Sequence, residues 1–216
     1  MIMAILCAFG SLMFIMTLVY SLDYSLSTNT IILHGVIFSM FASSISNFII
    51  TFAGEKVKTI TFWTLGSLQG SSYQNALVLL ITLVICGTLL MAHARELNAF
   101  AISEDNARNI GVDVRRVKLI VLICVSAAIG VCVSISGNIG FVGLVTPHMV
   151  RRLTGPNHKR LLPASAFGGA TFLLLADLIA RIVFRPRELP SGVVTSFVGS
   201  IVFVVIYCRS RRMQRA

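Results

Sequence analysis

Charged residues are scarce in this sequence of 216 residues and make up 12% of it. Soluble domains carry about 25% charged and about 45–50% apolar residues, whereas 56% of this chain is hydrophobic. The longest stretch of mixed polar and apolar sequence, residues 95–116, is too short to form a soluble catalytic or ligand-binding domain. These proportions exclude a water-soluble globular protein.

Several signatures of chemistry are also missing from the sequence. No GxxxxGK[ST] loop occurs, so the chain lacks the usual cradle for nucleotide phosphates, and any ATP hydrolysis would need another subunit. The five cysteines stand singly in or beside apolar runs, without a CxxC pair or a histidine at metal-ligand spacing. We therefore expect no catalytic residue, no metal site and no cofactor.

What the sequence does contain is a series of apolar runs. They cover Ile2 to Tyr20, Ile31 to Ala53, Ala76 to Ala94, Val117 to Ile135, Ile139 to Val150, Leu161 to Ala180 and Val193 to Cys208. Most are near the ~20 residues that a membrane-spanning helix needs. The first run lacks a basic segment before it and a clear cleavage site, which favours a span over a removable signal peptide. The sequence predicts an all-α integral membrane protein, a polytopic bundle of about seven transmembrane helices in a single domain over residues 1–216.

The fifth run differs from the others because it is short and rich in glycine. Thr146 followed by Pro147 has the pattern of an N-cap and a first helical position. We therefore predict extended backbone that becomes helical only at Pro147. Extended backbone at membrane depth must be shielded by protein or line a wet cavity.

Small residues recur in the second and sixth runs, for example Gly35 and Ala42 in the second and Gly168 and Gly169 in the sixth. Small side chains let membrane helices approach closely, so we expect both helices inside the bundle. The alternative is the ordinary glycine-rich composition of membrane helices.

The distribution of basic residues predicts the orientation. The formal net charge is +10, and 13 of the 18 Lys and Arg residues fall in one set of alternate loops. Cytoplasmic loops retain Lys and Arg, which places residues 95–116 and the C-terminus in the cytoplasm and, with seven crossings, Met1 outside. Topology accounts for the positive charge, so we do not expect nucleic-acid binding.

The cytoplasmic loop 95–116 contains a helix signal. Ser103 precedes two acidic residues, Glu104 and Asp105, and Gly111 is a plausible C-cap, so a helix of about two turns is expected. Charge pattern alone leaves open whether this helix meets a partner or is only a solvated loop helix.

Several motifs, in order and at fitting spacing, resemble the permease subunits of ATP-binding-cassette importers for iron-siderophores, haem and vitamin B12. They are Leu97-Asn98, Glu104, Ala107-Arg108, Ile110-Gly111-Val112, Gly137 to Leu144, Pro147-His148, Arg151, Gly155, His158, Leu162-Pro163, Ala176-Asp177, Ala180-Arg181 and Glu188 to Gly192. The resemblance implies a protein of the cytoplasmic (inner) membrane that moves such a chelate by alternating access, and family members typically have ten helices. It also implies that the first three are missing here, through a start codon further upstream or because the chain is a natural fragment.

The resemblance implies a role for three groups of residues. The loop 95–116 would be the coupling element that docks on a separate ATPase subunit, through Leu97, Asn98, Glu104, Ala107, Arg108 and Gly111. The translocation pathway and its packing would involve Gly137, Gly140, Phe141, Gly143, Pro147, His148 and Arg151. Arg181 and Glu188 would meet an extracytoplasmic substrate-binding protein, and a second permease copy or paralogue would complete a dimer.

Two of these residues also have simpler interpretations. His148 has no second ligand nearby, which favours a hydrogen-bonding or interfacial histidine over a metal site. Asp177 and Arg181 are four residues apart on one helix face, so they could form a local ion pair at the outer boundary.

Two rival functions remain open at this point. An ATP-independent secondary transporter or channel would need ionisable groups in the middle of its spans, whereas the charges here lie at span ends or in loops. An inactive or regulatory permease fragment would bind partner subunits without transporting anything.

Overall fold

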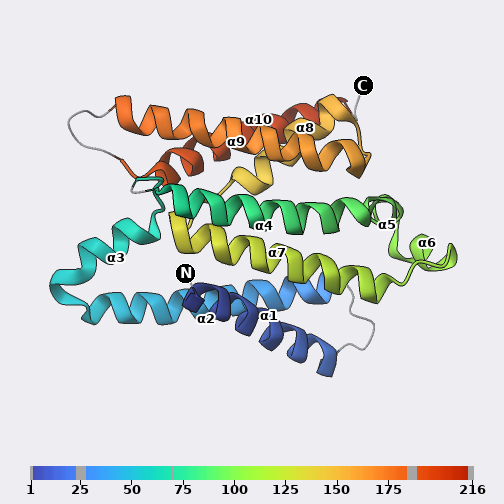
Figure 1. Ribbon diagram of the computed structural model, residues 1–216, viewed down its shortest axis with the longest axis horizontal. Helices are drawn as coiled ribbons and strands as arrows, with labels where there is room; N and C mark the ends of the chain where they lie inside the picture. The colour runs from blue at the N-terminus through green and yellow to red at the C-terminus, as the bar shows by residue number, and fades with distance from the viewer. Residues whose placement is uncertain (1, 23–27, 70, 184–188, 214–216) are drawn as a thin grey trace.

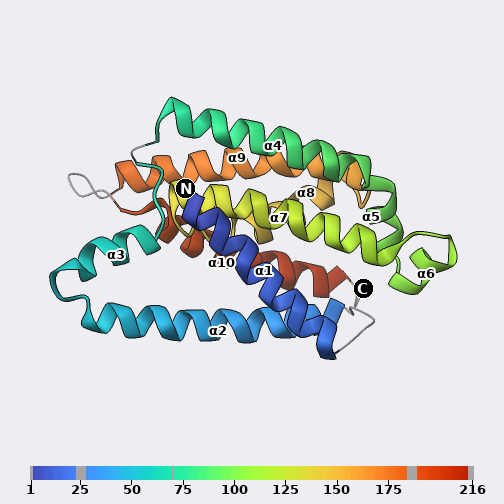
Figure 2. The same ribbon diagram turned by 60° about the horizontal axis from the view of Figure 1, so that its bottom comes forward.

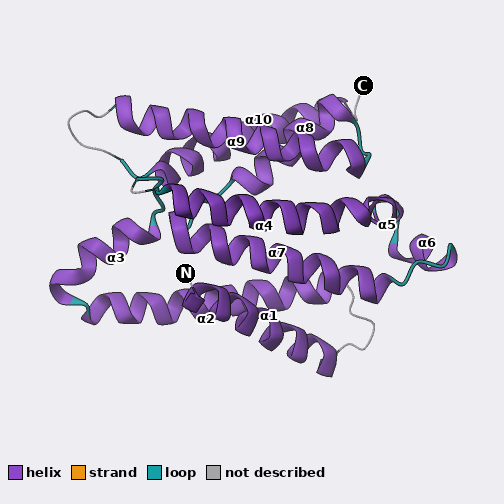
Figure 3. Ribbon diagram, viewed as in Figure 1, coloured by secondary structure: helices purple, strands orange, loops and turns teal. Residues whose placement is uncertain are grey.

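The structure is a computed structural model that describes residues 2–22, 28–69, 71–183 and 189–213. These residues form helices and connecting turns, with no strand among them (Figure 3). The helices are α1 (Ile2–Leu22), α2 (Thr28–Phe52), α3 (Val57–Thr64), α4 (Tyr73–Ala92), α5 (Ala94–Phe100), α6 (Glu104–Asn109), α7 (Val114–Ser136), α8 (Val142–Thr154), α9 (His158–Ile182) and α10 (Ser191–Met213). A 3-10 turn, Gly54–Lys56, precedes α3.

Five helices among the described residues are long and apolar enough to cross a membrane: α1, α2, α4, α7 and α9. Helix α10 contributes a shorter apolar segment, Ser191–Ile206, and α8 has only 13 residues. The prediction of an all-helical membrane bundle is confirmed, and five long apolar helices together with the shorter ones roughly match the predicted number of about seven.

Local caps stabilise the starts of single helices, and packing around α7 and α9 holds the helices together. Ser72 and Asp113 cap α4 and α7 by accepting hydrogen bonds from Asn75 N at 3.2 Å and Arg116 N at 3.0 Å. Helices α1 and α4 pack on α7, whereas α8 and α10 pack on α9. Large apolar side chains remain exposed over most of the spans, as expected for surfaces that face lipid.

The small residues of the second and sixth runs have different surroundings. In α9, a side chain at Gly168 would lie 3.0 Å from Val150 and 3.1 Å from Thr146, so the close approach to α8 is confirmed. Helix α2 has no buried residue, and nothing lies within 4 Å of a side chain placed at Gly35. The prediction that α2 lies inside the bundle is wrong for the described chain, because only α1 and α3 make substantial contact with it (Figure 2).

Helix α8 begins earlier than the sequence pattern indicates. Residues 137–141 are non-helical as predicted, but α8 starts at Val142, with Pro147 inside it and Thr146 buried rather than capping. Phe141 precedes the helix in the left-handed conformation, with φ of 66°. The prediction of a start at Pro147 is wrong because the Phe141 carbonyl already accepts hydrogen bonds from Leu144 N and Val145 N.

Candidate functional site

Helices α5 and α6 form a short unit, residues 94–109, beyond the ends of α4 and α7 (Figure 1). Ser103 caps α6 by accepting a hydrogen bond from Asn106 N at 3.0 Å. Gly111 lies just past the helix with φ of 85°, a conformation that glycine adopts without strain. Both ends of the predicted loop helix are therefore confirmed, and local sequence signals determine them.

The six residues proposed for coupling lie at this one end of the bundle but face different ways. Ala107 is completely buried, and Leu97 lines a groove between α5 and α7. Arg108 and Gly111 are exposed. Only part of the motif is therefore available to a partner protein.

Asn98 joins α5 to the beginning of α9. Its side-chain oxygen accepts a hydrogen bond from His158 N at 2.8 Å and lies 2.7 Å from His158 Nδ1. Its amide group donates to Asn157 Oδ1 at 3.2 Å, and Asn157 in turn caps α9 by accepting from Lys159 N. The α5–α6 unit is thus attached to α9 through a polar contact between residues far apart in the sequence.

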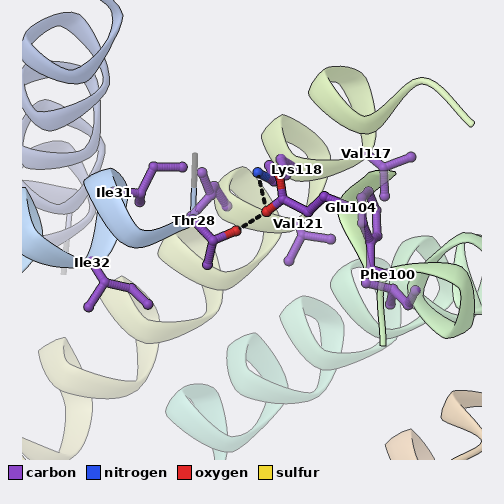
Figure 4. A pocket seen from close by; sticks show the side chains of 10 residues that line it. Thr28, Ile31, Ile32, Phe100, Glu104, Val117, Lys118 and Val121 are labelled. Atoms are coloured by element: carbon purple, nitrogen blue, oxygen red, sulfur yellow. Dashed lines mark hydrogen bonds and ion pairs between the residues drawn. The ribbon is translucent and has the colours of Figure 1, made fainter. Parts of the chain in front are cut away.

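Glu104 points back from α6 toward α7 and α2. Its Oε1 lies 2.7 Å from Lys118 Nζ and accepts a hydrogen bond from the Thr28 hydroxyl (Figure 4). Partial burial opposes ionisation of this carboxyl, but the bonds from Lys118 and Thr28 and the charges of Lys118 and Arg108 outweigh it and lower its pKa. Sequence reasoning missed Lys118 and Thr28 because each belongs to a different helix, where no local spacing connects it to Glu104.

A second feature is a close backbone contact at the opposite end, which we call the glycine junction: Gly66, Gly137 and Gly192. A side chain at Gly137 would lie 2.3 Å from the Trp63 carbonyl oxygen, and one at Gly192 would lie 1.9 Å from the Leu65 carbonyl oxygen. Backbone hydrogen bonds run from Gly192 N to Gly66 O at 3.1 Å and from Ser67 N to Ser136 O at 2.8 Å. The junction joins the chain after α3, the end of α7 and the start of α10.

The remaining pathway candidates are spread along α8 and do not converge on one point. Gly140 lies near α10, where an added side chain would be 3.5 Å from Ser196 Oγ. Phe141 packs on Gly199, whereas Gly143 is in open space. The His148 ring packs edge-on against Phe203 with centroids 6.0 Å apart. Arg151 is exposed in the last turn of α8.

Of the two residues proposed to meet a binding protein, Arg181 lies at the end of α9 away from the α5–α6 unit (Figure 1). Its Nε is 2.7 Å from Asp177 Oδ2, which confirms the predicted local ion pair. Glu188 lies outside the described residues. Within the described residues, no group of three or more His, Cys, Asp or Glu side chains could hold a metal ion.

The chain is similar to a family of transport proteins. Residues 1–209 match the model of the FecCD transport family. The chain is 41% identical over 216 residues to an uncharacterized ABC transporter permease protein, YvrB, of Bacillus subtilis (strain 168), covering 99% of this chain and 60% of that one. It is 34% identical over 203 residues to the vitamin B12 import system permease protein BtuC of Vibrio vulnificus (strain CMCP6), covering 93% and 61%.

A solved structure has the same fold. It is described as a metal-chelate type ABC transporter in an inward-facing conformation, with a TM-score of 0.87 and 30% sequence identity. The match covers 95% of this chain and 65% of that chain. The chain thus spans about three fifths of the length of the curated relatives named above.

Proposed function

This chain belongs to the FecCD transport family, and on that premise we propose that it is the membrane-spanning subunit of an ATP-binding-cassette importer. The proposed cargo is an iron-siderophore, haem or a corrinoid, because relatives of the chain are named for vitamin B12, hemin and iron chelatin transport. The observation that carries the proposal is the α5–α6 unit, a short capped element that extends beyond the spans at one end of the bundle (Figure 1).

The exposed surface around this unit supports docking of a separate ATPase subunit. Ile102 and Ile110 flank α6 and are 75% and 69% exposed, and Leu153 at the end of α8 is 87% exposed. These side chains lie in turns and helix ends, where lipid tails do not cover them, and exposed apolar groups of this kind mark protein interfaces. Arg108, exposed on α6, would add a charged contact.

In the proposed mechanism, the chain itself performs no covalent chemistry. ATP binding would close a pair of ATPase subunits in the cytoplasm, and the α5–α6 unit would move with the ATPase on which it docks. Helices α4 and α7 flank this unit in the sequence, so its displacement would tilt them and change which side of the bundle is open. The pathway would form between this chain and a second permease copy or paralogue.

The opposite end would receive the substrate-binding protein. The Arg181 side chain remains about half exposed although it is paired with Asp177. A partly exposed guanidinium can add a bidentate contact to a carboxylate of a docking partner. We propose Arg181 as one contact and Glu188 as another, with the C-terminus of the chain in the cytoplasm.

Affinity purification from membranes tests this proposal. The tagged chain should retain an ATPase subunit that carries a nucleotide-binding P-loop. Replacement of Arg108 by Glu together with Ile110 by Asp should reduce capture at least about tenfold, because both changes disrupt the exposed contact surface. Asp177→Asn, at the opposite end, is the matched control and should leave capture unchanged. Failure of the unmodified, membrane-inserted chain to capture any ATPase would contradict the proposal.

A second candidate function is partner binding without transport. It is favoured by α2, because this helix lacks buried residues along its whole length and its uncovered surface could pack against another subunit. Uptake of radiolabelled ferric siderophore, haem and cobalamin into proteoliposomes with the captured ATPase separates the two candidates. Uptake of any of the three substrates supports an importer. Capture of the ATPase with uptake of none of them supports a binding subunit.

A further inference from the structure

The coupling motif contains a carboxylate that faces into the protein. Glu104 is the first residue of α6, and its side chain is 30% exposed, whereas Lys118, its partner on α7, is 14% exposed. The Lys118 ammonium approaches Glu104 Oε1 to 2.7 Å, and the Thr28 hydroxyl from the start of α2 donates to the same oxygen (Figure 4). One oxygen atom therefore links three helices that are separate in the sequence.

This contact lies at the polar edge of an otherwise apolar groove. The groove has a volume of about 440 Å³ and lies between α2, α5, α6 and α7. Its walls include Leu97, together with Ile31, Phe100 and Val121, which are labelled in Figure 4. The apolar walls limit access of water from one side, whereas Glu104 stays 30% exposed and Thr28 is exposed, so the ion pair is partly shielded from solvent.

The α5–α6 unit is attached to the bundle at a second place. Asn98 in α5 contacts Asn157 and His158 at the start of α9. If the Glu104 contact is removed, α6 can still pivot about the Asn98 contact. A force on α6 would then reach α7 only through the short turn that joins them, and its direct connection to α2 would be lost.

From this geometry we infer that Glu104 is a positioning residue that fastens the coupling helix α6 to α7 and α2 through Lys118 and Thr28, rather than a contact for the ATPase. The inference rests on the proposed function, because the tether matters for transport only if α6 is moved by a motor. It assigns different tasks to neighbouring residues of one short helix. Glu104 holds the helix to the spans, and Arg108 with Ile110 presents it to the partner.

Hydrogen exchange on the full chain in lipid nanodiscs tests the tether itself. Glu104→Gln and Lys118→Gln should each raise exchange of the hydrogen-bonded amides of α6 and the turn after it, residues 107–112, about fivefold. Asp105→Asn is the matched control, because it removes an acidic charge and its helix-dipole contribution from the same helix turn without touching Lys118, and it should raise exchange by no more than about twofold. The exchanged pair, Glu104→Lys with Lys118→Glu, should restore most of the protection. Unchanged exchange in both single variants would overturn the inference.

Coupling is then measured on the complex with the captured ATPase. Glu104→Gln should keep ATPase capture near that of the unmodified chain while lowering substrate transported per ATP hydrolysed about fivefold, with partial recovery in the exchanged pair. A loss of capture as large as that of the double variant Arg108→Glu with Ile110→Asp would overturn the inference, because Glu104 would then be a docking residue. If the unmodified chain captures no ATPase, the proposed function fails while the exchange results still decide whether the tether exists.

Discussion

Glycines of the sequence motifs occupy very different surroundings. Gly137 and Gly192 place their α-carbons against backbone carbonyls of residues 63–66, where a side chain would collide with main-chain atoms. Gly143 lies inside α8 with nothing within 4 Å. The sequence identifies the run near residue 140 as short and rich in glycine, but only the positions of α3 and α10 show which glycines must lack a side chain.

This contrast predicts opposite effects of the same substitution. Gly192→Ala should destabilise the protein by about 3 kcal/mol, because the added methyl group overpacks against the Leu65 carbonyl and the backbone must move. Gly143→Ala should stabilise it by up to about 1 kcal/mol, because alanine favours the helix and meets open space. Thermal unfolding in detergent, followed by circular dichroism, measures both, and equal effects of the two changes would contradict the description of the junction.

The Glu104 contact should respond to acid in a defined direction. Its pKa is lowered, so the contact contributes stability above the ordinary glutamate value of about 4.3 and loses it as pH falls through the lower folded value. Protection of the α6 amides, corrected for the intrinsic effect of pH on exchange, should therefore be constant from about pH 7 to pH 5 and fall below about pH 4. In Glu104→Gln this acid-dependent step should be absent. Loss of protection already near pH 6 in the unmodified chain would exclude Glu104 as its source.

Whole elements differ in how far local sequence predicts them. Helix α6 agrees with its prediction because Ser103 at its start and Gly111 just past its end act within a few residues. Helix α8 does not, because its first turn depends on the left-handed Phe141 packing against Gly199 of α10. That contact joins residues far apart in the sequence, so the pattern of Thr146 and Pro147 indicated a later start.

Replacing Pro147 distinguishes the two possible starts of α8. If α8 begins at Val142, alanine at position 147 restores the backbone donor to the Gly143 carbonyl and removes a ring from the helix interior. Pro147→Ala should then raise stability by about 1–3 kcal/mol. If the helix began at Pro147, the change would be close to neutral, since the first helical amide has no partner within the helix. Pro156→Ala, in the turn between α8 and α9, is the control, and the shift of the thermal midpoint is the measurement.

At the scale of the whole molecule, composition predicted more than local pattern did. Scarce charge and repeated apolar runs were sufficient to predict a helical membrane bundle, because the bilayer imposes the same requirement on every span. The tether to Lys118 and the exposure of α2 could not be predicted, since both depend on how separate helices are placed. The turns that carry most basic residues nevertheless lie together: the α5–α6 unit, the α8–α9 turn and the end of α10 occupy one end of the bundle (Figure 1).

This common end gives a direct test of orientation. In a background where the five native cysteines are replaced by alanine, Asn109→Cys places one thiol on α6 and Glu55→Cys places one in the turn before α3. A membrane-impermeant maleimide added to intact cells should label the Glu55→Cys variant and leave Asn109→Cys unlabelled. After the cells are opened, Asn109→Cys should react as well, which shows that its thiol is accessible.

The physical reason for this expectation is that short basic loops are retained in the cytoplasm during insertion, and 13 of the 18 basic residues lie in the set of loops that includes α6. Labelling of Asn109→Cys from outside would place the α5–α6 unit beyond the reach of any cytoplasmic ATPase and would remove the basis for a coupling role.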